Sequence, residues 1–189
     1  MKEKIIEVSI GLFGKNGFTE TSIQDIVEEL GVTKGTFYYY FKSKEELLME
    51  IHLRYIEDLL VSQEEIVNQI GTQEQKLFEM VYMLMKHIEG HGQSARVFFR
   101  EMQHLNENHL KDIFKKSDQF KENIKKVIEA GINEGEFRKD LHANIVTLAI
   151  LGAVNWSYHW FDPKGELDEK AVSKIYIDLM LNGLKETER

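Results

Sequence analysis

The chain has 189 residues, of which 42% are apolar and 30% are charged, an ordinary composition for a soluble globular protein. It contains no cysteine, which excludes disulfide bonds, cysteine-ligated zinc and thiol nucleophiles. The formal net charge of -8 argues at first against a nucleic-acid partner, because neutralised phosphates supply most of the sequence-independent affinity for DNA.

Helices are predicted rather than strands, because the chain has a single proline, Pro163, and long stretches without turn residues. The first predicted helix, residues 2–16, carries Ile6, Ile10 and Phe13 at helical spacing with charged residues on its other side. Gly17 marks its end. These features favour an all-α fold.

A capping box predicts the start of a second helix. Ser22 is followed three residues later by Asp25, and an apolar stripe then runs to Gly31. Only two residues later Thr33 can cap a third helix, residues 34–41. Two short helices joined by a tight turn are typical of a helix-turn-helix.

The third helix has two different faces at about 100° per residue. One face is aromatic and is predicted to be core: Phe37, Tyr40 and Phe41. The other presents groups that suit phosphates and base edges: Lys34, Gly35, Tyr38 and Tyr39. Residues 32–44 carry lysines and no acid, so the local charge favours DNA although the net charge does not. The alternative is that the tyrosines pack and the lysines are solvated.

The segment GVTKGTFYYYFKSKEELL, residues 31–48, resembles the N-terminal signature of TetR-family transcriptional repressors. Residues 12–13, 17–18 and 21–26 match the same pattern in order and spacing, whereas Val27 and Leu30 depart from it by apolar exchanges. The resemblance implies a helix-turn-helix DNA-binding domain at 1–46. It also implies a helical ligand-binding and dimerisation domain at 47–189.

The resemblance also implies roles for individual residues. Those on or beside the bases of the major groove would be Thr33, Lys34, Gly35, Thr36 and Tyr38. Those holding phosphates would be Tyr39, Tyr40, Lys42 and Lys44. Gln24 would reach the DNA backbone or a base. Tyr40 is ambiguous, because its angular position lies on the core side.

Further helices are predicted at residues 45–68, 73–88, 93–104, 107–131, 141–160 and 167–184. The helix at 141–160 is apolar nearly all round, so it must be covered on every side, and a second copy of the chain is an economical cover. The resemblance agrees, because TetR-type proteins usually dimerise through their last two helices. A twofold dimer would set two recognition helices about 34–36 Å apart and predicts an inverted-repeat operator on double-stranded DNA.

The ligand site is predicted from methionine and aromatic side chains that crowd two neighbouring helices, for which plain core packing is the alternative. Residues 155–160, NWSYHW, also resemble a segment of TetR-type regulators that respond to acyl-CoA thioesters. Arg96 and Arg100 either face an anionic ligand or pair with acids such as Glu101. The predicted set is Phe78, Tyr82, Met83, Arg96, Phe99, Arg100, Met102, Trp156, His159 and Trp160. We expect a small hydrophobic effector, a fatty acid or acyl-CoA, with a planar cationic drug as the alternative.

No motif indicates an enzyme, a cofactor or a metal site. His87 and His91 have the spacing of zinc proteases, but Ile88 stands where the catalytic glutamate would be. Glu-x-x-His occurs at 101–104 once, whereas di-iron bundles need it twice. We expect a cytoplasmic repressor without a membrane partner. A helical enzyme or metal protein, and an interaction module that has lost DNA binding, are the alternatives.

Overall fold

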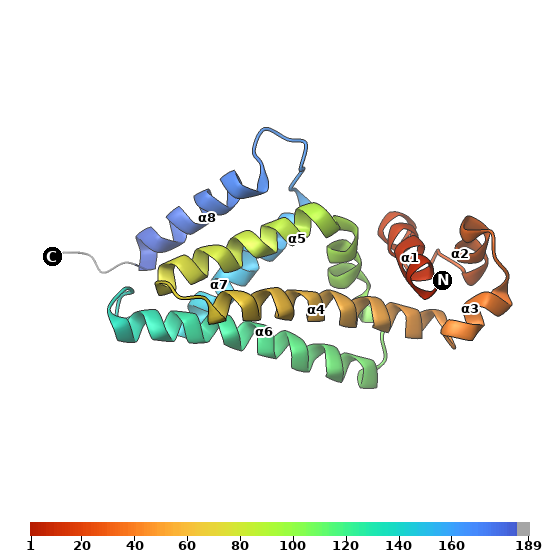
Figure 1. Cartoon of the computed structure of the whole chain (residues 1–189), viewed down its shortest axis with the longest axis horizontal. Coiled ribbons are helices and arrows are strands. Elements are labelled where there is room, and N and C mark those ends of the chain that lie inside the picture. The colour runs from red at the N-terminus through yellow and green to blue at the C-terminus, as the bar shows by residue number, and fades with distance from the viewer. Residues whose placement is uncertain (185–189) are drawn as a thin grey trace. The chain divides into compact units, whose positions relative to one another are not determined.

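The computed structural model describes residues 1–184, apart from the side chains at positions 91, 183 and 184. Every regular element in this part of the chain is a helix (Figure 1), which confirms the all-α prediction. The α-helices are α1 (Lys2–Asn16), α2 (Ile23–Leu30), α3 (Lys34–Tyr40), α4 (Lys44–Asn68), α5 (Gln73–Glu101), α6 (Glu107–Glu134), α7 (Ala143–Asn155) and α8 (Glu169–Leu184). The 3-10 helices η1 (Met102–His104) and η2 (Trp156–His159) follow α5 and α7.

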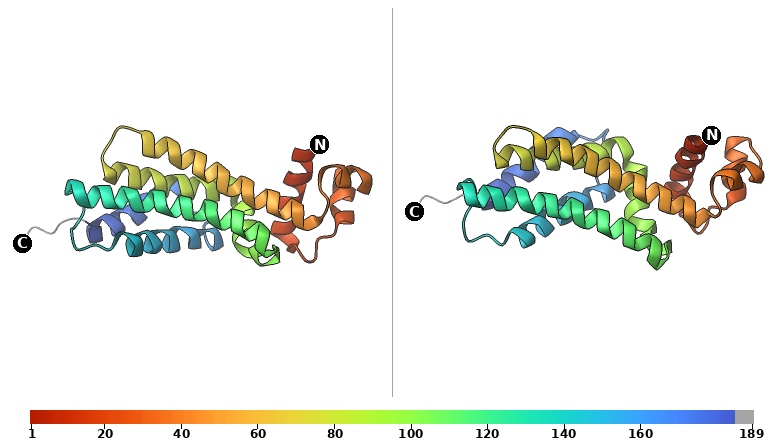
Figure 2. Two further views of the ribbon diagram at one scale, coloured as in Figure 1. Left: turned by 90° about the horizontal axis from the view of Figure 1, so that it is seen from below. Right: turned by 60° about the horizontal axis from the view of Figure 1, so that its bottom comes forward.

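The caps predicted for α2 and α3 are present. The Ser22 hydroxyl accepts the Asp25 N–H at 3.2 Å, and the Asp25 carboxylate accepts the Ser22 N–H at 2.7 Å. Gly31 ends α2 with a φ of 64°, a left-handed conformation that favours glycine. Thr33 Oγ1 then accepts the N–H of Thr36 at 3.4 Å. The tight turn at residues 31–33 therefore joins α2 to α3, and α1 lies beside them (Figure 2).

α5 is one continuous helix, whereas the sequence predicted two helices with a break near residues 89–92. Gly90 and Gly92 lie at the position of the predicted break. Neither glycine has a positive φ, and a Cβ at either position would meet nothing within 4 Å. Buried side chains on both sides, Ile88 and Ala95, hold the helix in the core and offset the low helix propensity of glycine, about 1 kcal/mol each.

Two boundaries near the C-terminus also differ from the prediction. α6 runs to Glu134 and ends at Gly135, whose φ is 81°. The helix was predicted to end at residue 131, but Gly131 lies inside it, and a Cβ there would overlap ring carbons of the buried Phe137. The predicted helix at 141–160 is the shorter α7 followed by η2, because the backbone tightens at residue 156.

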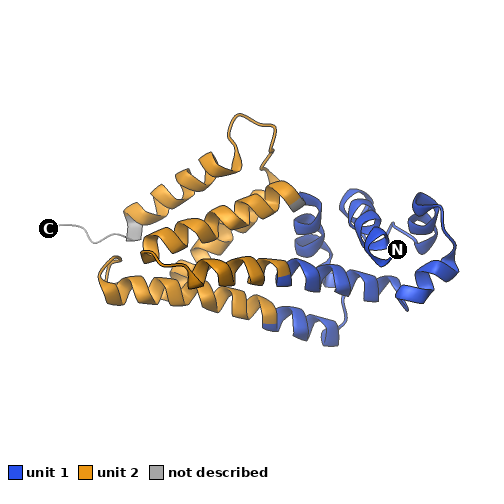
Figure 3. Cartoon of the chain, viewed as in Figure 1, with its two compact units in different colours: residues 1–57, 91–115 blue, residues 58–90, 116–189 orange. Residues whose placement is uncertain are grey.

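The chain packs as two compact units (Figure 3). Unit 1 comprises residues 1–57 and 91–115, and its core includes Phe13, Phe37, Leu47, Leu48 and Phe98. Unit 2 contains residues 58–90 and 116–184, and its core includes Leu77, Met80, Met85, Ile124 and Phe137. Helices α4, α5 and α6 each contribute residues to both units. This division follows packing rather than chain order, so the functional boundary at residue 46 stays a prediction.

Candidate nucleic-acid interface and apolar cavity

The outer face of α3 combines tyrosine rings with bare backbone. Tyr38 and Tyr39 are 53% and 81% exposed, whereas Phe37 is completely buried. Lys34 and Gly35 are exposed as well. The two faces predicted from helical periodicity are therefore confirmed for these residues. Aromatic side chains this exposed are an informative surface feature, because large apolar groups are usually covered.

Packing within the chain does not require glycine at position 35. Its φ is not positive, and a Cβ added there would meet Thr33 Oγ1 at 3.5 Å, an ordinary contact distance. Glycine inside a helix is nevertheless about 1 kcal/mol less favourable than alanine. The chain therefore accepts the low helix propensity of Gly35, although none of its own side chains fills the space that a Cβ would occupy. The backbone at Gly35 is thus open to close approach by another molecule.

Thr36 and Tyr40 lie between the two faces of α3, and both are half-buried. The Thr36 hydroxyl is 3.3 Å from that of Thr33. The Tyr40 ring meets the Tyr39 ring edge-on, with centroids 4.8 Å apart. The intermediate position of Tyr40 agrees with the ambiguity noted in the sequence.

The two lysines after α3 have different surroundings. Lys42 is exposed, and its main-chain N–H donates to the Glu46 carboxylate at 2.6 Å. The Lys44 ammonium donates to the carbonyls of Phe18 and Thr21, both at 2.6 Å, and lies 4.3 Å from the centroid of the Phe18 ring. Burial lowers the pKa of Lys44. The phosphate contact predicted for Lys44 competes with these bonds, which tie α4 to the turn between α1 and α2.

Gln24 lies exposed in the first turn of α2, where its amide nitrogen donates to Glu28. Its neighbour Asp25 is also exposed. Hydrogen bonds from the Ser22 backbone and hydroxyl lower the pKa of the Asp25 carboxyl. Asp25 therefore stays ionised as part of the helix cap, and Gln24 is the neutral polar side chain of this turn.

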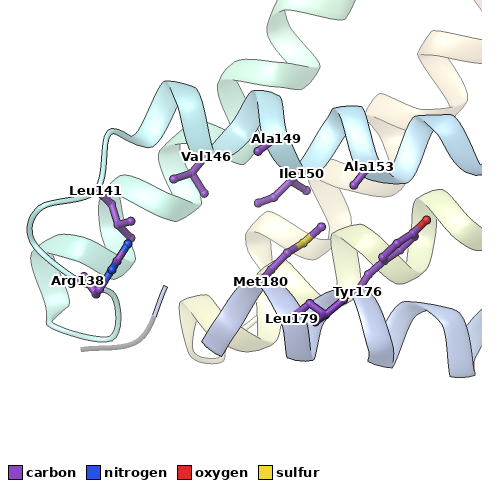
Figure 4. Close-up of a pocket in the computed structure, with 9 residues that line it drawn as sticks. All are labelled: Arg138, Leu141, Val146, Ala149, Ile150, Ala153, Tyr176, Leu179 and Met180. Atoms are coloured by element: carbon purple, nitrogen blue, oxygen red, sulfur yellow. The ribbon is translucent and has the colours of Figure 1, made fainter. Parts of the chain in front are cut away.

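An apolar cavity of about 490 Å³ lies between α7 and α8 in unit 2 (Figure 4). Its lining residues are Arg138, Leu141, Val146, Ala149, Ile150, Ala153, Tyr176, Leu179 and Met180. Arg138 stands beside Leu141, at the end of the cavity where the chain enters α7 (Figure 4). Its Nε is buried without a hydrogen bond among the described residues and is 3.6 Å from Asp140 Oδ1. The cavity therefore joins an apolar wall to one guanidinium group.

None of the residues predicted for the ligand site lines this cavity. Six of them lie in unit 2, on α5 and at η2: Phe78, Tyr82, Met83, Trp156, His159 and Trp160. The other four lie in unit 1: Arg96, Phe99, Arg100 and Met102. Met83 is buried core, whereas Arg96 and Arg100 are exposed. The predicted set is therefore divided between the two units, and its role in ligand binding stays a prediction.

Some of the residues that line this cavity could have been inferred from the sequence. Ala149 and Ala153, small residues in an apolar helix, line it on the α7 side. The contributions of Arg138 and Tyr176 were missed. These residues are far apart in the sequence and lie in different elements, so no spacing pattern joins them.

Large apolar side chains are exposed on α7, on α8 and in the segment 156–160. They are Ile145, Leu148, Trp156, Trp160, Ile175 and Leu179, each between 48% and 68% exposed. An apolar surface of this kind on a single chain is a candidate interaction surface. Four of these residues, Ile145, Leu148, Trp156 and Trp160, belong to the segment 141–160 that was predicted to need cover on every side.

In the part of the chain that the structure describes, no cluster of three or more metal-binding side chains occurs. The His91 side chain of the predicted zinc-protease spacing lies outside the described residues. Among the described residues there is also no helix with the length and hydropathy needed to span a membrane.

Comparison with known sequences gives two family matches. Residues 5–51 match the profile described as bacterial regulatory proteins, tetR family, and residues 71–184 match the profile described as tetracyclin repressor-like, C-terminal domain. The second profile alone spans more than half of the chain.

Individual proteins are similar along nearly the whole chain. The HTH-type transcriptional repressor KstR2 of Rhodococcus jostii (strain RHA1) is 25% identical over 187 residues, which cover 97% of this chain and 90% of that protein. The fatty acid metabolism regulator protein of Bacillus subtilis (strain 168) is 22% identical over 182 residues, covering 96% and 94%. The solved structure of the ketosteroid transcriptional regulator KstR2 of Mycobacterium tuberculosis superposes with a TM-score of 0.91 at 25% identity, covering 98% of this chain and 95% of that one.

Proposed function

This chain belongs to the TetR family and is a transcriptional repressor of that type rather than an enzyme. We propose that it binds an inverted-repeat operator as a homodimer. We also propose that it leaves the operator when a small hydrophobic ligand binds. The observation that carries the proposal is the outer face of α3, with its exposed tyrosines, exposed Lys34 and open backbone at Gly35. A helix with such a face suits the major groove of duplex DNA.

For the DNA contacts we keep the residues of α3 and its flanks. Base edges would be contacted by Thr33, Lys34, Gly35, Thr36 and Tyr38. Phosphates would be held by Tyr39, Tyr40 and Lys42, with Gln24 reaching the backbone from α2. Lys44 is proposed as a positioning residue instead, because its ammonium already donates to two carbonyls. Because Gly35 has no Cβ, the wall of the DNA groove could approach the backbone of α3 closely at this position.

The dimer would form through α7 and α8, the last two helices. Their exposed aliphatic side chains, such as Ile145, Ile175 and Leu179, support this interface. A second copy packed there would also border the cavity between α7 and α8. The functional domains would then be 1–46 for DNA and 47–189 for ligand and dimer, within a cytoplasmic protein.

The effector would be an anionic amphiphile, a fatty acid or acyl-CoA. The names of the relatives, a ketosteroid regulator and a fatty acid metabolism regulator, support an apolar ligand of this class. The cavity between α7 and α8 pairs an apolar lining with Arg138, and no carboxylate lines it, which favours an anion over a planar cation. We propose this cavity as the effector site in preference to the ten residues inferred from the sequence.

A two-state dimer accounts for release. One state would place the two copies of α3 about one DNA turn apart, and the ligand would favour another state by binding it more tightly. A ligand shifts this equilibrium only by its differential affinity for the two states.

The test begins with selection of duplexes from a random pool by the purified protein, followed by titration of the selected duplex in fluorescence anisotropy. We expect an inverted repeat, a steep loss of affinity with salt, and at least about tenfold weaker binding with palmitoyl-CoA or palmitate. Failure to enrich any duplex would leave the interaction-module alternative. Enrichment with no response to either probe would remove the proposed effector class. Mass spectrometry of co-purified molecules tests the class independently.

A further inference from the structure

A short corner of the chain, residues 101–109, belongs to unit 1 although both helices that it connects also extend into unit 2. It comprises the last residue of α5, the 3-10 helix η1 and the start of α6. Figure 3 colours it with α1, α2 and α3. We call residues 101–109 the corner and residues 2–40 the reading head.

The first contact of the corner is with Glu45, in the first turn of α4. Glu45 Oε1 accepts the backbone N–H of Asn106 at 2.9 Å and the Asn106 side-chain N–H at 2.6 Å. It is also 3.1 Å from Nδ1 of His109. These groups are separated by more than 60 residues along the chain. A single carboxylate oxygen, Oε1 of Glu45, thus holds the start of α6 against the start of α4.

Asn106 uses its two side-chain atoms in opposite directions. Its Oδ1 accepts the N–H groups of Asn108 and His109, at 3.0 and 3.1 Å, and so caps α6. Its Nδ2 donates to Glu45. A displacement of the first turn of α6 therefore cannot leave Glu45 in place without breaking one of these bonds.

The second contact is with Phe18, in the turn between α1 and α2. The His104 ring stacks on the Phe18 ring with centroids 5.2 Å apart. His104 Nε2 is 3.4 Å from Oε2 of the buried Glu101, and this contact restrains the orientation of the His104 ring. The Lys44 ammonium also lies over the Phe18 ring and holds the carbonyls of this turn. The corner is therefore joined both to the turn that precedes α2 and to the helix that follows α3.

We propose that the corner sets the position of the reading head, and that Glu45 and His104 are positioning residues for operator recognition. The inference rests on the proposed function, because position matters only if two heads must match two half-sites. A movement of α5 or α6 would shift the corner, and its contacts would then shift the reading head. With the bonds of Glu45 and the ring contact of His104 intact, the two reading heads of a dimer accept a narrow range of half-site spacings. Loosening the bonds widens that range.

The test substitutes Asn106→Asp in the full-length protein. Aspartate still caps α6, but its carboxylate faces Glu45 and repels it. The double variant Glu45→Gln/Asn106→Asp restores a donor and acceptor pair. Asn108→Asp is the matched control, because it adds the same charge two residues away, at an exposed side chain.

The readout is the ratio of affinities for the duplex selected by the wild-type protein and for the same duplex with one base pair inserted between half-sites. We expect about a tenfold ratio for the wild type and for Asn108→Asp, about threefold or less for Asn106→Asp, and recovery in the double variant. Equal ratios for Asn106→Asp and Asn108→Asp, or no recovery in the double variant, would overturn the inference. A wild-type protein that selects no paired half-sites would instead defeat the proposed function.

Discussion

The outer face of α3 and the outer faces of α7 and α8 are both exposed, yet their chemistry differs. α3 presents phenol hydroxyls, a lysine and a glycine backbone, whereas α7 and α8 present aliphatic side chains such as Leu148 and Leu179. A polar, hydrogen-bonding surface suits a hydrated and charged partner, and an aliphatic one suits removal from water. Exposure alone therefore does not identify a partner, but the kind of exposed atom does.

The largest expected effect separates the subunits. In Leu179→Glu a carboxylate replaces a side chain that is 68% exposed in one chain and would be buried in the dimer. Burying an unpaired charge is strongly unfavourable, so we expect monomers in sedimentation velocity and at least about a hundredfold loss of operator affinity. Val61→Glu is the control, because Val61 is 60% exposed and belongs to α4 rather than to the last two helices. Dimers that persist in Leu179→Glu would contradict the interface.

Gly35→Ala tests the other surface and predicts opposite changes in two quantities. The added methyl group has room within the chain and raises helix propensity, so the melting temperature should stay equal or rise. It stands where DNA is proposed to approach, so operator affinity should fall by about tenfold or more. A variant that melts lower and binds normally would assign Gly35 a purely internal role.

A comparison of Lys42→Ala with Lys44→Ala sharpens the assignment within the reading head. Lys42 is exposed, and its loss should reduce the slope of log affinity against log salt by about one. Lys44 donates to the Phe18 and Thr21 carbonyls, so its loss should lower the melting temperature with a smaller change in slope. Equal slopes for Lys44→Ala and Lys42→Ala would return Lys44 to the phosphate contacts.

The smallest expected effect concerns the pH dependence of stability in unit 1. Burial lowers the pKa of His52 below its usual 6.5, although the carbonyls of Leu48 and Phe98 act in the opposite direction. The unfolded chain then binds more protons than the folded one as pH falls below about 6.5, so folding stability declines there. His52→Gln should reduce the drop in melting temperature between pH 7.5 and 5.5. An unchanged drop would mean that other groups cause it.

The local features of the first forty residues were predictable because they depend on neighbours in sequence. The Ser22 capping box, the Gly31 turn and the buried Phe37 each follow from spacings of a few residues. The family signature in the same segment points to the DNA-binding role. The α3 contacts with DNA remain predictions.

Features that depend on distant residues were not predictable. The bonds of Lys44 join it to carbonyls 23 and 26 residues away, and those of Glu45 join it to Asn106. The break predicted within α5 is absent, because packing of buried side chains on both sides of it decides the continuity of that helix. The cavity between α7 and α8 was not predicted, because methionine and aromatic composition does not reveal which helices face each other.

The contact between Gly131 and Phe137 constrains variation at a position that does not itself line the proposed ligand cavity. Any side chain at 131 would occupy the volume of the Phe137 ring, and that ring would have to leave the core. Arg138 is the next residue, so its guanidinium would be displaced with the ring. Related sequences that keep an arginine at position 138 should therefore also keep glycine at position 131, one turn before the end of α6.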